Sequence, residues 1–161
     1  MKRSTHIVVG FCTGFTATFF STNVLEAIVA GTLGGFLNYI IDAYGHRGAF
    51  RSPFTHSVIG VTIMCASLGV AIYAILSLTL NYVPSISILE GLLFSGYSHL
   101  LLDSLTRFGI YPLYPFSRKR FSIACISYDD PLINRVLIAA SILATILLVI
   151  HRIEQALGKA L

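Results

Sequence analysis

The chain has 161 residues, of which 55% are hydrophobic and only 11% are Asp, Glu, Lys or Arg, and its mean hydropathy is +0.80. A soluble domain carries about 25% charged residues because its surface needs polar cover, so this composition excludes a soluble globular protein and predicts a membrane protein. The three cysteines are odd in number and widely spaced, which indicates neither a disulfide framework nor a cysteine-based metal site.

Five apolar segments are long enough to be membrane spans. In hydrocarbon every backbone polar group needs an internal partner, which runs of this length obtain as helices. We therefore predict an all-α polytopic membrane protein in which the whole chain, 1–161, forms one integral-membrane domain. In chain order the expected spans are residues 7–21, 24–41, 57–80, 86–105 and 132–150, with an interfacial loop at 106–131.

The first span is the weakest because its apolar core is short and follows Lys2, Arg3 and His6. That arrangement is also typical of a signal peptide, but no A-x-A-like cleavage site follows, so a span is favoured. Gly10 and Gly14 form a small-xxx-small pattern, which predicts close contact with another helix.

Basic residues are distributed unequally between the two sides of a five-span chain. The N-terminus and the loops at 42–56 and 106–131 share one side, which carries nine Lys and Arg residues against two on the other. This positive-inside bias places the N-terminus and both long loops in the cytoplasm and the C-terminus outside the cell membrane. The nine are Lys2, Arg3, Arg47, Arg51, Arg107, Arg118, Lys119, Arg120 and Arg135, and the two are Arg152 and Lys159.

Six ionisable side chains arrive at the cytoplasmic ends of the first four spans: His6, Asp42, His46, His56, His99 and Asp103. Asp42 with His46, and His99 with Asp103, stand one helical turn apart, the spacing at which one helix offers two ligands to a metal. Ionisable groups beside spans normally face the bundle interior or a functional cavity. Imidazole and carboxylate without thiolate suit Zn, Mn, Fe or Ni, so the pattern predicts a divalent metal site of one or two ions. His151 follows the last span on the opposite side.

Several stretches resemble the YdjM-type membrane-bound metal-dependent hydrolases. They are residues 45–48 (Gly-His-Arg-Gly), 51–57 (Arg-Ser-Pro-Phe-Thr-His-Ser), 98–106 (Ser-His-Leu-Leu-Leu-Asp-Ser-Leu-Thr) and 115–117 (Pro-Phe-Ser). Residues 38–46, Asn-x-x-Ile-Asp-x-x-Gly-His, are similar to related uncharacterised archaeal membrane proteins. The resemblance covers residues 6–122 and implies that the six polar residues are those of the family's site. Where the family has Leu-Pro-Asp-x-Asp, Ile40 replaces the first Asp, which favours one ion over two.

A metal, most simply zinc, with an open water position would lower the pKa of that water and support hydrolysis. Either Asp42 or Asp103 would then serve as general base, and the sequence does not choose between them. Four hydroxyl residues adjoin the ligands and would either orient them or bond back to their own helix carbonyls: Thr55, Ser57, Ser98 and Ser104.

A site at the cytoplasmic surface favours a lipid or lipid-linked ester as substrate. Arg47, Arg51 and Arg107 suit phosphate, so a phospholipase-like activity on a phosphoester is expected. The loop at 106–131 combines aromatic residues with a basic patch at 118–120, which indicates contact with membrane lipids or simple anchoring. The same membrane explanation disfavours nucleic acid as a partner.

Two other functions remain compatible with this pattern. A metal-ion transporter would also place His and Asp in spans, although alternating access needs ligands near the midplane. A non-catalytic membrane protein would use a structural metal with a closed coordination shell.

Overall fold

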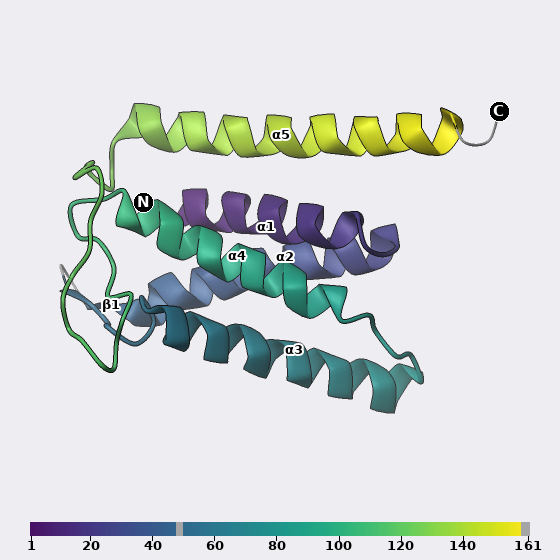
Figure 1. Cartoon of the computed structure of the whole chain (residues 1–161), viewed down its shortest axis with the longest axis horizontal. Helices are drawn as coiled ribbons and strands as arrows, with labels where there is room; N and C mark the ends of the chain where they lie inside the picture. The colour runs from purple at the N-terminus through teal and green to yellow at the C-terminus, as the bar shows by residue number, and fades with distance from the viewer. Residues whose placement is uncertain (48–49, 159–161) are drawn as a thin grey trace.

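The computed structural model describes residues 1–47 and 50–158, except for the side chains of His46, Arg47 and Phe50. In this part the chain forms five helices: α1 (Arg3–Phe19), α2 (Val24–Gly45), α3 (Val58–Leu80), α4 (Ser87–Ser104) and α5 (Pro131–Gly158) (Figure 1). Two short antiparallel strands, β1 (His46–Arg47) and β2 (Phe50–Arg51), pair His46 with Arg51 between α2 and α3. The all-α class is confirmed apart from this hairpin.

The helices extend beyond several of the predicted apolar segments. α1 begins at Arg3 rather than at residue 7, so His6 lies within the helix, and α2 continues through Asp42 to Gly45. α5 runs to Gly158 rather than to residue 150. A helix satisfies its own backbone groups, so it does not have to end where the apolar sequence ends.

Three of the described helices, α2, α3 and α5, are long and apolar enough to cross a membrane. α1 has only 17 residues, and α4 carries Glu90, His99 and Asp103 within its 18. The fold is therefore that of a helical membrane protein. For α1 and α4, hydropathy alone does not show whether the helix crosses the membrane.

α1 packs against α2 and α4, which also contact each other, while α3 packs on α4 and α5 on α1 (Figure 1). Glycines allow the three inner helices to approach closely. A Cβ atom on Gly14 would lie 3.0 Å from the carbonyl oxygen of Ala30 and 3.2 Å from that of Gly91, and one on Gly10 would collide with the side chain of Asn38. The predicted close contact of the Gly10 and Gly14 face is thus confirmed.

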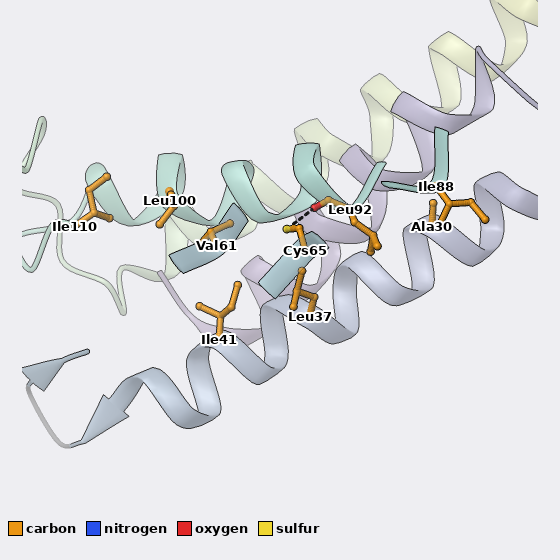
Figure 2. Close-up of a cluster of buried hydrophobic side chains, with 9 residues drawn as sticks. All are labelled: Ala30, Leu37, Ile41, Val61, Cys65, Ile88, Leu92, Leu100 and Ile110. Atoms are coloured by element: carbon orange, nitrogen blue, oxygen red, sulfur yellow. Dashed lines mark hydrogen bonds between the residues drawn. The ribbon is translucent and has the colours of Figure 1, made fainter. Parts of the chain in front are cut away.

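A cluster of buried apolar side chains joins α2, α3 and α4 (Figure 2). Cys65 in this cluster donates a hydrogen bond to the carbonyl oxygen of Leu92, at 3.2 Å. Ile110, from the loop after α4, closes the cluster at the end of the bundle where α4 ends, so the loop packs as part of the bundle. The members are Ala30, Leu37, Ile41, Val61, Cys65, Ile88, Leu92, Leu100 and Ile110.

The loop between α4 and α5 folds over the ends of α3 and α4. The backbone N–H of Tyr111 donates to the carbonyl of His56, at 2.9 Å, and that of Ile123 donates to Ser104, at 2.7 Å. Ser57 caps α3, since its hydroxyl oxygen accepts from the Gly60 N–H at 3.0 Å. These contacts fix the backbone on both sides of His56.

At the opposite end of the bundle, Glu26 secures the turn between α3 and α4. Its Oε1 accepts hydrogen bonds from the Tyr82 hydroxyl, at 2.5 Å, and from the Ser85 N–H, at 3.1 Å. The bond to Glu26 raises the pKa of Tyr82. Glu90 is exposed. At this end of the described bundle the buried Glu26 carboxylate is therefore engaged in a loop contact.

Candidate metal centre

Four predicted ligands meet where α1 begins and where α2 and α4 end: His6, Asp42, His99 and Asp103. Each is buried, with at most 3% of its surface exposed. The helix extensions described above carry His6 and Asp42 into this position. His56, just before α3, is also fully buried and reaches the same cluster. The side chain of His46 lies outside the described residues.

Asp103 is the centre of this cluster. Its Oδ1 accepts hydrogen bonds from Arg51 Nη2 and from the α-amino nitrogen of Met1, each at 2.8 Å, and lies 3.1 Å from His6 Nε2. Its Oδ2 lies 3.3 Å from His56 Nε2 and 3.6 Å from His99 Nε2. One carboxylate thus contacts groups from α1, the hairpin, the start of α3 and its own helix, so it holds this end of the bundle together.

The geometry of the four residues fits a single metal ion. One ligand atom from each of the four lies within 4.8 Å of the others. His99 Nε2 faces Asp103 Oδ2 at 3.6 Å and Asp42 Oδ1 at 3.9 Å. Tetrahedral ligands at zinc distances are separated by about 3.4 Å, so the observed spacing is close to that of a bound set.

The environment of His99 gives the strongest indication that the cluster holds a metal ion. Among the described residues, neither of its ring nitrogens has a hydrogen-bond partner, although the side chain is fully buried and its ring stacks on that of His6 with centroids 3.9 Å apart. A buried polar atom without a partner costs about 1–3 kcal/mol. A metal ion would provide the missing partner for one nitrogen, so the donor set fits an imidazole and carboxylate site for a divalent ion.

The side chain of Arg51 is buried next to the cluster. Its Nη1 donates to the carbonyl of Gly109 at 2.6 Å and to the Thr106 hydroxyl at 3.2 Å, while Nη2 bonds Asp103. Burial lowers the pKa of the Arg51 guanidinium, and the charge of Asp103 opposes that effect. An arginine stays protonated in a protein. Arg51 is therefore a cation that links the Asp103 carboxylate to the turn after α4.

The other predicted phosphate-binding arginines are arranged differently. Arg107 is exposed, and its Nε donates to the carbonyl of Cys125 at 3.0 Å. Arg47 has a side chain outside the described residues. Substrate binding by these arginines stays a prediction, and the buried contacts of Arg51 favour a role in positioning Asp103.

The four hydroxyl residues beside the ligands divide into two groups. Thr55 Oγ1 lies 2.9 Å from His56 Nδ1, so it is placed to orient that ring. Ser57, Ser98 and Ser104 each donate to a carbonyl three residues earlier. This is the local backbone bonding that the sequence offered as the alternative to orienting a ligand.

The contacts that two asparagines and Met1 make at or near the cluster were not predicted from the sequence. Asn38 Nδ2 donates to the carbonyls of His6 and Ser95, at 3.0 and 3.3 Å, and thereby links α1, α2 and α4 one turn from the cluster. Asn134 Oδ1 accepts from the Thr5 hydroxyl at 2.6 Å. Each asparagine is a buried amide in an apolar segment, and that was an available signal. No sequence signal pointed to Met1.

The fold and the site define a class: a helical membrane protein with a buried cluster of imidazoles and carboxylates that could hold a metal ion. The chain belongs to the YdjM inner membrane protein family, whose model matches residues 1–158. No curated protein and no solved structure matches it.

Proposed function

We propose that the protein is a five-span membrane hydrolase that uses a divalent metal, zinc in the simplest case, to cleave a lipid or lipid-linked ester at the cytoplasmic face. The observation that carries this proposal is the unbonded imidazole of His99 facing Asp42 and Asp103. A structural role alone would be expected to satisfy such a buried group with hydrogen bonds.

We assign each residue of the cluster a role in the reaction. A divalent ion held by His6, His99 and Asp103 would supply Lewis-acid activation of water and of the ester. Asp103 already receives Arg51 and Met1 on one oxygen and faces two imidazoles with the other, so it acts as a ligand. We assign the general base to Asp42, which takes a proton from the attacking water. The water oxygen bonds to phosphorus or the acyl carbon, the ester C–O or P–O bond breaks, and protonated Asp42 returns its proton to the leaving oxygen, which departs as the alcohol.

A lipid substrate is supported by the loop beside the site. Phe116 is 87% exposed, Phe121 is 50% exposed, and the basic residues 118–120 are exposed next to them. Aromatic and basic side chains in this combination suit the headgroup region of an anionic membrane. The loop would hold the cluster at the depth of a lipid ester.

The topology is testable with a native cysteine. Cys125 is exposed in the loop, whereas Cys12 and Cys65 are buried in helices. A membrane-impermeant maleimide should label Cys125 in inside-out vesicles and leave it unlabelled in intact spheroplasts. Cys125→Ser should abolish the signal. In that background Asn81→Cys, at the exposed α3–α4 turn, should show the reverse pattern. Labelling of Cys125 in intact spheroplasts would refute the proposed sidedness.

The activity is tested by reconstituting the zinc-loaded protein in phosphatidylglycerol vesicles and measuring the release of water-soluble headgroup together with zinc flux. We expect release without flux, and loss of release in Asp42→Asn. The variant with both Glu26→Gln and Glu90→Gln should keep its activity, since Glu26 only secures a distant turn and Glu90 is exposed. Flux that depends on these glutamates, with no hydrolysis, would establish a transporter. Bound zinc with neither activity would point to a structural metal.

A further inference from the structure

We infer that a groove between α1, α4 and α5 binds one acyl chain of the lipid substrate, an inference that rests on the proposed function and adds the site of its apolar part. The groove has a volume of about 350 Å³, within the range of ligand pockets. Its walls include Cys12 and Thr16 from α1, Phe20 directly after α1, Phe94 from α4, and Ala144 and Leu148 from α5.

The lining presents hydrocarbon even where the sequence has hydroxyl groups. The hydroxyls of Thr13, Ser141 and Thr145 each donate to a carbonyl of their own helix, at 2.9 Å. Thr16 Oγ1 contacts Thr145 Oγ1 at 3.3 Å. Because these donors are engaged, the groove offers methyl and aromatic groups to its occupant. An aliphatic chain matches such walls better than a polar ligand does.

α5 packs along α1, and polar or charged contacts secure it near both ends. Asn134 is the only buried residue of α5, and its Oδ1 accepts from the Lys2 N–H at 3.0 Å beside the start of α1. Farther along, Arg152 lies over the rings of Phe19 and Phe20, 5.2 and 5.6 Å from their centroids. Figure 1 shows α5 running alongside α1 at one edge of the bundle. The space between these attachments faces the hydrocarbon of the membrane.

The groove begins about two helical turns along α1 from the metal centre. His6 and Thr13 are seven residues apart, which places them on one face of α1 and about 10 Å apart along its axis. Thr13 Oγ1 also lies 3.3 Å from the Oγ of Ser98, the neighbour of His99. A lipid whose ester lies at the cluster would therefore direct its chain along α1 into the groove. This proximity to the cluster favours a substrate chain over a second copy of the protein.

The groove can be tested with phosphatidylglycerol that carries a photoreactive diazirine midway along one acyl chain, in vesicles with the full-length zinc-loaded protein. Crosslinks should concentrate in residues 12–20 and 141–148. Ala144→Phe, which fills the groove, should reduce them severalfold, whereas Ala139→Phe, exposed on α5 outside the lining, should not. Even labelling along α5, no effect of Ala144→Phe, or crosslinks joining two copies of the chain would overturn the inference.

Kinetics provide a second, independent readout. Ala144→Phe should raise KM for long-chain esters by about tenfold or more, as expected when about two methylenes lose their burial, while KM for four-carbon esters stays unchanged. An equal change for both chain lengths would contradict an acyl-chain site. If the wild type hydrolyses no ester at all, the proposed function fails, and the crosslinking pattern still decides whether the groove binds a chain.

Discussion

Asp103→Ala is expected to be the most damaging single substitution in the chain. It removes the acceptor of Arg51 Nη2 and of the Met1 nitrogen, and it leaves the Arg51 guanidinium, only 7% exposed as a residue, without its carboxylate. Breaking a buried ion pair by removing one partner costs about 3–5 kcal/mol. For a chain of this size that loss corresponds to a melting temperature lower by about 10 °C. The measurement is thermal unfolding in detergent, without added metal.

Two further variants test whether the loss of stability comes from the unpaired buried charge of Arg51. Asp129→Ala removes an exposed carboxylate whose Oδ1 accepts from the Ser127 hydroxyl, so it should leave the melting temperature nearly unchanged. Adding Arg51→Met to Asp103→Ala should recover part of the loss, because the unpaired buried charge is gone. All variants should still insert, since insertion depends on the apolar segments. A melting temperature for Asp103→Ala within 2 °C of wild type would contradict the central position of this carboxylate.

The second large effect is expected at His99, and only when metal is present. Zinc at about 100 times its dissociation constant should stabilise the wild type by about 2.7 kcal/mol, which a chelator removes. His99→Ala should abolish this zinc-dependent shift, because the variant lacks the imidazole that faces both carboxylates. Scanning fluorimetry with and without chelator measures the difference.

His151→Ala is the control for His99. His151 is exposed on α5 and lies 3.0 Å from Gln155, far along the chain from the cluster. The zinc-dependent shift should therefore be the same as in the wild type. If His99→Ala kept the full shift, or if His151→Ala lost it, the cluster would not be the zinc site.

The helices could be predicted because long apolar segments in a membrane have helix as their only simple solution. Their ends could not, because Arg3 to His6 are polar and Asp42 interrupts the apolar segment, yet the helices continue through them. The small buried face of α5 was also hidden, since a lipid-facing side chain and a protein-facing one look equally apolar in sequence. Asn134 alone marked where α5 is attached.

For the site, the crossing order of the spans predicted which helix ends meet, and His6, Asp42, His99 and Asp103 do lie together. Their role as ligands stays a prediction. The part played by Arg51 could not be predicted, because it depends on how the hairpin and the turn at Gly109 fold over α4. Sequence spacing relates residues within one helix and carries no information on such loop contacts.

The most direct test of this account is the metal content of the purified protein after zinc loading and removal of unbound metal, measured by mass spectrometry. We expect about one ion per chain in the wild type and in His151→Ala, and almost none in His99→Ala, since loss of a ligand opens the site. A wild type that retains no divalent ion, or a His99→Ala variant that retains as much as the wild type, would contradict it.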